Sequence, residues 1–198
     1  MNMKVWLKSK LADRVLSSVR EELVRLINPD STLLEVGCGT GDLLFRASSK
    51  LKHGIGVDIN KAMIKYAEDR RNILGVNNIS FSCKDALKLE PSKYDISTST
   101  LCLHEIGGKE ACDLLNYMVN NSRKVLIADY TSATTLIGKI GVEIDELFSG
   151  HYGNYRKYKQ RGEISFYVNR IGATVKDVIR TKIDGISIWI IDGKHVHN

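Results

Sequence analysis

Three glycines at alternate positions mark the part of this sequence best suited to chemistry. The segment reads Glu35-Val-Gly37-Cys-Gly39-Thr-Gly41 and lies between an apolar stretch, 32–36, and a stretch with helical spacing. Glycine has no side chain, so the backbone can turn sharply here and approach a ligand closely. The next helix would offer free backbone N–H groups at its start. These features predict a loop that binds a nucleotide, and a tight turn without a ligand is the alternative.

The spacing of these glycines differs from that of a dinucleotide-binding loop. The generic dinucleotide pattern is G-x-G-x-x-G, whereas this chain has G-x-G-x-G with an acidic residue, Glu35, two positions before the first glycine. We therefore expect a smaller, zwitterionic ligand rather than a pyrophosphate. Asp42, at the start of the next helix, should strengthen this preference by repelling a pyrophosphate.

Two further acidic residues follow later strands. Asp58 ends the stretch 54–58 and can accept hydrogen bonds from both ribose hydroxyls of an adenosine. Asn60 can cap the following helix, which leaves Asp58 for a ligand. Asp85 follows a third strand and can accept from an adenine amino group, although an aspartate in this position is often only a turn residue.

Strand and helix patterns alternate along most of the chain. Strands are expected at 32–36, 54–58, 79–82, 94–99 and 124–130, with helices at 11–27, 42–51, 60–75 and 111–119. The segments 174–182 and 186–192 predict an antiparallel hairpin around Asp184-Gly185. The order indicates an α/β fold with a doubly wound, mostly parallel seven-stranded sheet. Ligands of such sheets bind at the carboxyl ends of the strands.

Length and composition set the broad class. The chain has 198 residues, 43% of them hydrophobic, and a net charge of +6. This length suits one domain over 1–198, with an N-terminal helical segment at 1–29. No apolar run approaches the ~20 residues of a membrane span and 1–10 lacks a secretory apolar region, so we expect a soluble, cytoplasmic protein. The four cysteines lack the spacing of zinc ligands.

Taken in order, the motifs resemble those of the class I S-adenosylmethionine (SAM)-dependent methyltransferases. The matching segments are Leu34–Gly41, Gly56–Asp58, Asp85-Ala86, Tyr94–Glu105 and Val125–Asp129. The resemblance implies a Rossmann-like methyltransferase fold whose sheet ends with an antiparallel strand, and SAM as the cofactor. It also implies a set of cofactor-binding residues: Glu35, Gly37, Cys38, Gly39 and Gly41 near the methionine part, Asp58, Ile59 and Met63 near the ribose, Asp85 and Ala86 at the adenine, and Ser99 and Thr100 near the reactive methyl group.

The segment Leu101–Ile106 resembles the Leu-His stretch of small-molecule methyltransferases of the ubiquinone/menaquinone-biosynthesis type. No Asn-Pro-Pro-Tyr or Asp-Pro-Pro-Tyr follows the fourth strand, as it does in amino-methylating nucleic-acid enzymes. No Asp-Asn pair follows the fifth strand, as metal-dependent catechol-type enzymes require, because Asp129 precedes Tyr130. We therefore expect a small-molecule acceptor and no metal. A nucleic-acid partner is less favoured, and the sequence predicts no oligomeric state.

A general base is needed only where the acceptor is protonated before methyl transfer. The candidate catalytic residues are His104 and His151, with Asp129 as a further titratable group. His104 has the better location, since it follows a strand expected to end at the cofactor. A histidine that only caps or hydrogen-bonds the next helix is the alternative.

About forty residues separate the fifth strand from the hairpin, more than a short loop and one helix require. We expect 131–172 to form a helical lid insertion over the cofactor. Its aromatic side chains would exclude water and orient a small acceptor, whereas the alternative is an ordinary packing helix with surface tyrosines. The expected substrate contacts are His104, Tyr130, His151, Tyr152 and Tyr155.

Three other functions remain open. An RNA methyltransferase would use the basic residues between Arg156 and Arg161, which otherwise form a solvated helix face. A NAD-dependent oxidoreductase would share the fold and the ribose-binding acid, but the glycine spacing disfavours it. A non-catalytic SAM-binding module would bind the cofactor and transfer no methyl group.

Overall fold

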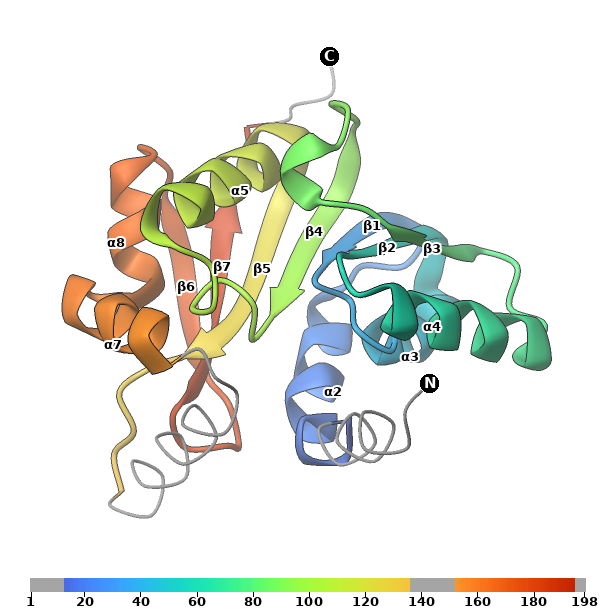
Figure 1. The fold of residues 1–198 in the computed structure, drawn as a ribbon, viewed down its shortest axis with the longest axis horizontal. Helices are drawn as coiled ribbons and strands as arrows, with labels where there is room; N and C mark the ends of the chain where they lie inside the picture. The colour runs from blue at the N-terminus through green and yellow to red at the C-terminus, as the bar shows by residue number, and fades with distance from the viewer. Residues whose placement is uncertain (1–12, 136–151, 195–198) are drawn as a thin grey trace.

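A seven-stranded sheet forms the centre of the protein in a computed structural model that describes residues 13–135 and 152–194 (Figure 1). The strand order is β3-β2-β1-β4-β5-β7-β6. Strands β1 to β5 run parallel, and β7 is antiparallel to both β5 and β6. The strand bounds are β1 Ser31–Val36, β2 Leu51–Asp58, β3 Ile79–Cys83, β4 Tyr94–Thr100, β5 Ser122–Tyr130, β6 Val175–Arg180 and β7 Ile186–Asp192.

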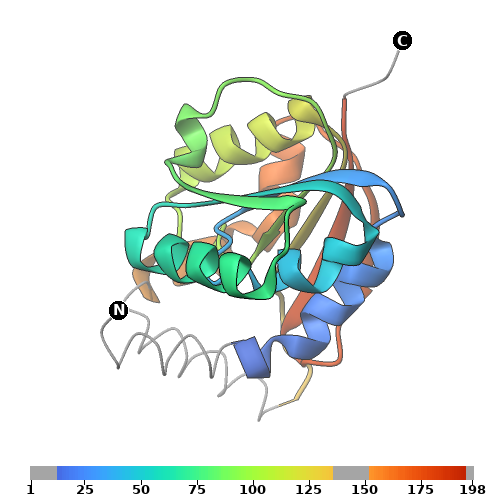
Figure 2. The same cartoon turned by 90° about the vertical axis from the view of Figure 1, so that its right-hand side faces the viewer.

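Helices cover both faces of this sheet (Figures 1 and 2). One face carries α2 (Ser17–Leu26), α3 (Asp42–Ala47) and α4 (Lys61–Leu74), and the other carries α5 (Gly108–Asn121), α7 (Tyr152–Arg161) and α8 (Glu163–Arg170). Two short 3-10 turns, η1 (Ser48–Lys50) and η2 (Ala86–Lys88), join these elements. The doubly wound sheet and its C-terminal antiparallel hairpin confirm the predicted fold class.

The central strands are buried on both faces, which explains their nearly continuous apolar sequence. In β5, residues 125–128 are fully buried. Strand β4 is the exception, because Ser97, Thr98 and Ser99 are equally buried although polar. The hydroxyl of Ser97 hydrogen-bonds that of Ser122 on β5, so part of this polarity is satisfied inside the sheet.

Local sequence patterns predicted most helix and strand boundaries to within a few residues, and the end of one helix was predicted wrongly. The Asn60 side chain caps α4 by accepting from the backbone N–H groups of Ala62 and Met63, and Gly75 ends that helix with φ +65°, as predicted. The helix expected at 42–51 instead ends at Ala47. Leu51 already belongs to β2. An apolar residue in that position fits the helical and the strand pattern equally well.

This topology places the candidate site. The strand order reverses between β1 and β4, so the carboxyl ends of β1, β2 and β4 meet at the point where ligands bind in open α/β sheets. Within the described ranges, no helix has both the length and the apolar character needed to cross a membrane.

Tight packing around β2 gives a first prediction. A Cβ atom on Gly56 would lie 2.7 Å from the Phe81 ring and 2.9 Å from the Cys38 Sγ atom. We expect Gly56→Ala to lower the free energy of unfolding by about 1–3 kcal/mol through overpacking. Gly153→Ala is the control, because the new Cβ on α7 meets no atom within 4 Å in the described part of the chain and alanine favours a helix by roughly 0.5–1 kcal/mol. Denaturant unfolding measures both. Equal stability of wild type and Gly56→Ala would contradict the packing.

Candidate functional site

The glycine loop after β1 has a left-handed backbone at each of its three glycines, with φ +69° at Gly37, +51° at Gly39 and +72° at Gly41. Two of them are also required by packing. A Cβ on Gly37 would lie 2.8 Å from the Cys102 Sγ atom, and one on Gly41 would lie 2.3 Å from the Phe81 ring. No atom of the described residues lies within 4 Å of a Cβ on Gly39. The open space at Gly39 is therefore where a ligand can approach the backbone.

The carboxylate of Asp58 connects the end of β2 to this loop. Its Oδ2 atom accepts from the Gly39 N–H at 2.8 Å, and its Oδ1 atom accepts from the Asn60 N–H at 2.7 Å. Each carboxylate oxygen can accept more than one hydrogen bond, so both retain capacity for a ligand. Asp58 thus holds the loop and still presents an acceptor beside it.

A cavity of about 430 Å³ opens next to Asp58, within the size range of small-ligand sites. Its walls come from the ends of β1 and β2, the turn after β3 and the turn between β4 and α5. The lining residues are Val36, Gly37, Val57, Asp58, Ile59, Lys84, Asp85, Ala86, Leu87, Leu101, Cys102, Glu105, Ile106, Glu110 and Leu114.

Five residues predicted to bind the cofactor line this cavity: Gly37, Asp58, Ile59, Asp85 and Ala86. Asp85 also has the turn role that its sequence position suggested, because its side chain accepts from the Leu87 N–H at 3.0 Å at the start of η2. The structure therefore brings the predicted ribose and adenine positions together.

The remaining seven predicted residues lie outside the cavity lining: Glu35, Cys38, Gly39, Gly41, Met63, Ser99 and Thr100. Ser99 is fully buried in the sheet, opposite Val36 of β1 and Ile127 of β5. Cys38 is buried beneath the loop, where its sulfur contacts the position of Gly56. A cofactor contact by these seven residues stays a prediction.

The sequence reasoning did not identify the α5 side of the cavity. Glu110 and Leu114 of α5 line it four residues apart, so one face of this helix borders the site, and Ile106 lines it from the turn that precedes α5. This four-residue spacing is present in the sequence and could have identified the α5 side of the cavity. Leu101, which the family resemblance also indicated, has φ +49°, a strained conformation for a leucine, in the turn that leads from β4 to the cavity.

Glu35, which lies on β1 behind the loop, is a buried carboxyl group with a shifted pKa. The residue is 2% exposed, and its Oε2 atom has no hydrogen-bond partner in the described part of the chain. Burial raises the pKa of Glu35 to about 8, against the lowering influence of Arg20. An unpaired buried acceptor is costly, so a ligand with a cationic donor would fit it.

His104 and Asp129 form a buried pair where β4 and β5 end. The His104 Nδ1 atom lies 2.5 Å from the Asp129 Oδ1 atom. Asp129 also accepts from the backbone N–H groups of Leu103, His104 and Tyr130. A carboxylate can only accept, so the proton of this contact belongs to Nδ1, and Nε2 becomes the basic nitrogen of the ring.

Aromatic rings surround this histidine. The ring centroid of His104 lies 4.7 Å from that of Tyr130, 6.1 Å from that of Tyr158 and 6.5 Å from that of Tyr155. The Tyr158 hydroxyl donates to the Tyr130 carbonyl at 2.6 Å, which fixes α7 against the end of β5. Tyr155 and Tyr158 are both buried, so the alternative of surface tyrosines is wrong for them.

The predicted lid segment is described only in part. Tyr152 begins α7, and His151 lies outside the described residues. The Asn154 side chain donates to the Glu105 carbonyl at 2.8 Å and thereby ties α7 to the turn after β4. The function of 131–172 as a lid, and the substrate contacts assigned to it, stay predictions.

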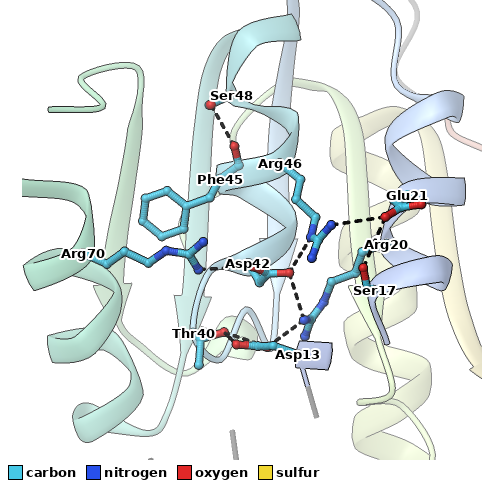
Figure 3. Close-up of polar contacts among 10 residues, drawn as sticks. All are labelled: Asp13, Ser17, Arg20, Glu21, Thr40, Asp42, Phe45, Arg46, Ser48 and Arg70. Atoms are coloured by element: carbon cyan, nitrogen blue, oxygen red, sulfur yellow. Dashed lines mark hydrogen bonds and ion pairs between the residues drawn. The ribbon is translucent and has the colours of Figure 1, made fainter. Parts of the chain in front are cut away.

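Asp42 does not have the role expected from its position. Its carboxylate is 8% exposed and contacts the Arg46 Nε atom at 2.6 Å and the Nη1 atoms of Arg20 and Arg70 at 3.2 Å each (Figure 3). Burial alone would raise the pKa of Asp42. The three arginines outweigh this effect, so the pKa lies below its ordinary value. Repulsion of a pyrophosphate by Asp42 was a wrong inference, because three guanidinium groups offset its charge.

Comparison with known proteins identifies the family. The model of a methyltransferase domain matches residues 27–160, more than half of the chain, and the chain therefore belongs to this family. The protein named "Putative methyltransferase 235L" of Invertebrate iridescent virus 6 is 28% identical over 179 residues, which cover 86% of this chain and 64% of the relative. The "Probable ribosomal RNA small subunit methyltransferase A" of Methanosarcina acetivorans is 29% identical over 58% of this chain and 41% of its own length.

A solved structure supports the fold. Magnesium protoporphyrin IX methyltransferase from Synechocystis PCC 6803, determined with bound SAH, superposes with a TM-score of 0.65 at 20% identity. The match covers 92% of this chain and 84% of that protein. The chain spans less than two thirds of the length of the two relatives above.

The raised pKa of Glu35 predicts a pH-dependent stability. The unfolded chain releases this proton near its ordinary pKa of 4.5, whereas the folded protein retains it to about 8. Stability is therefore lost as pH rises between these two values. We expect Glu35→Gln, which stays neutral, to gain stability relative to wild type progressively from pH 5 to pH 8.

Glu90→Gln, the same substitution at an exposed position, is the control and should show no such trend. Denaturant unfolding at a series of pH values measures the difference. A constant difference between Glu35→Gln and wild type across this range would contradict the buried, protonated state of Glu35.

Proposed function

We propose that the chain is a SAM-dependent methyltransferase that acts on a small-molecule acceptor. The observation that carries the proposal is the cavity beside Asp58, whose carboxylate faces both the glycine loop and the space where a ribose would lie. Family membership supports methyl transfer. SAM supplies a methyl group on a sulfonium, an excellent leaving group, so catalysis by the protein consists largely of positioning and exclusion of water.

The chain's own groups fit this cofactor by chemistry. The Asp58 carboxylate would accept from the ribose hydroxyls. Asp85 and Ala86 would contact the adenine, with Ile59 and Leu87 as apolar walls. The unpaired Oε2 atom of Glu35 would accept from the ammonium of the methionine part.

On the acceptor side, Asp129 would act as a positioning residue and His104 as the base. Asp129 holds the histidine by Nδ1, so Nε2 is the nitrogen that would take a proton from an acceptor hydroxyl or amine. The rings of Tyr130 and Tyr155 would keep water away from the transfer. This enclosure favours a small acceptor, and the Synechocystis protein acts by its name on a small molecule.

An RNA acceptor is the second candidate function. The exposed residues Arg156, Lys157 and Arg161 on α7 could contact phosphates, and the Methanosarcina relative is named as an rRNA methyltransferase. Incubation with SAM and cell extract separated into metabolite and RNA fractions distinguishes the two. Mass spectrometry should find the methylated product among the metabolites, and a product found only in the RNA fraction would overturn the small-molecule proposal.

Cofactor identity can be tested at Asp58. We expect calorimetry to show binding of SAM and S-adenosylhomocysteine, and none of NAD(H). Asp58→Ala should weaken SAM binding by about 1–3 kcal/mol, because the ribose hydroxyls lose a charged acceptor. Asp69→Ala, an exposed aspartate on α4, is the control and should leave the affinity unchanged. Preferential binding of NAD(H) would indicate an oxidoreductase instead.

The assignment of His104 predicts a separation between binding and turnover. His104→Ala should reduce the rate of S-adenosylhomocysteine release by about 10²–10⁴-fold while SAM affinity changes little, because the histidine acts on the acceptor. His53→Ala, an exposed histidine on β2, is the matched control. Unchanged turnover would remove His104 as the base, and a parallel loss of SAM affinity would indicate a structural role. Wild-type protein that binds SAM without turnover would be a binding module.

A further inference from the structure

A second cavity borders a different face of helix α5 from the one that faces the cofactor cavity. Glu110 and Leu114 line the cofactor cavity, whereas Lys109 and Cys112 line this one. Its volume is about 600 Å³, within the size range of small-ligand sites. The end of α7 and helix α8, which cover the same face of the sheet as α5 (Figure 1), form the rest of its wall. The two cavities share no lining residue, so a ligand here would leave the cofactor cavity open.

The charged side chains of this cavity are mostly basic. They are Lys109, Asp113, Arg161 and Arg170. The single carboxylate already has a partner, because the Lys109 Nζ atom contacts the Asp113 Oδ2 atom at 2.6 Å. Neither arginine forms an ion pair within the described part of the chain. The wall therefore carries an excess of positive charge that comes from two guanidinium groups.

The position of one guanidinium is more informative than the residue types. Arg161 ends α7 and Arg170 ends α8, and a basic residue at a helix C-terminus is stabilising in itself. That effect does not account for where the Arg161 guanidinium lies, which is against α5. A Cβ atom on Gly108 would lie 2.3 Å from its Nη1 atom. The glycine at 108 thus leaves the space in which this guanidinium reaches the cavity wall.

The remaining wall offers an apolar surface. Phe166 and Ile171 are partly buried, and Cys112 is buried. The Phe166 ring packs edge to face against that of Tyr167, with a centroid distance of 5.3 Å, which restricts its movement. Guanidinium groups match the geometry of phosphate and carboxylate oxygens, and an aromatic wall suits a planar apolar group.

We propose that the cavity between α5 and α8 is a second binding site, which takes an organic anion. Its phosphate, sulfonate or carboxylate group pairs with Arg161 and Arg170, and its planar apolar part lies against Phe166. An inorganic anion would leave the apolar wall in contact with water, and an uncharged ligand would leave both guanidinium groups without a counter-charge. The site is separate from the cofactor cavity, so the inference does not depend on methyl transfer.

The test uses two fluorescent probes that differ in charge. Anilinonaphthalenesulfonate is a planar aromatic anion, and N-phenylnaphthylamine has the same aromatic body without the sulfonate. Each is titrated in the presence of excess S-adenosylhomocysteine to fill the cofactor cavity. We expect Arg161→Gln and Arg170→Gln each to weaken binding of the anion about threefold to tenfold, because an exposed guanidinium gives only part of the energy of a buried ion pair. Binding of the uncharged probe, already weaker in wild type, should change by less than about twofold.

Arg156→Gln is the matched control, since this arginine is exposed on the same helix as Arg161 but does not line the cavity, and it should leave both affinities unchanged. Denaturant unfolding verifies that each variant is folded. Unchanged anion binding in Arg161→Gln and Arg170→Gln would overturn the inference, as would equal affinity of wild type for the two probes. An equal loss with Arg156→Gln would also overturn it, because it would indicate a diffuse basic surface of the kind that an RNA strand contacts.

Discussion

The hydrogen bond from the Gly39 N–H to the Asp58 carboxylate is the interaction on which the candidate site depends. Three left-handed glycines make the loop after β1 costly to order. The Val57 carbonyl accepts from Gly37 and Cys38, and Asp58 takes the next free N–H. The end of β2 therefore fixes the loop, so the geometry at Gly39 follows from the β1–β2 register.

Asp129 at the end of β5 holds the turn after β4, as Asp58 holds the loop after β1. Fully buried at the end of β5, it accepts three backbone hydrogen bonds and the His104 ring contact. It thus closes the turn after β4 and orients His104 with the same two oxygens. In both aspartates one carboxylate serves the fold and the site together, so their substitution would affect stability and function jointly.

Local signals in the sequence were sufficient for the strands, the glycine loop, the Asn60 cap and the hairpin, because each depends on neighbouring residues. They were not sufficient where partners come from distant segments. The sequence placed Asp42 beside a ligand, but Arg20 and Arg70 approach it from two other helices. The burial of Tyr155 and Tyr158 likewise depends on how α7 packs on the end of β5, which no local spacing encodes.

Residues other than Asp42 disfavour a cofactor that carries a pyrophosphate. The chain carries a net charge of +6, yet its cavity is lined by four carboxylates, Asp58, Asp85, Glu105 and Glu110, and one lysine, Lys84. A pyrophosphate there would face net negative charge. An adenosine that carries a cationic sulfonium would not be repelled by this charge. The preference first read from glycine spacing therefore has an electrostatic basis, supplied by strand ends and by α5 rather than by the helix that follows the loop.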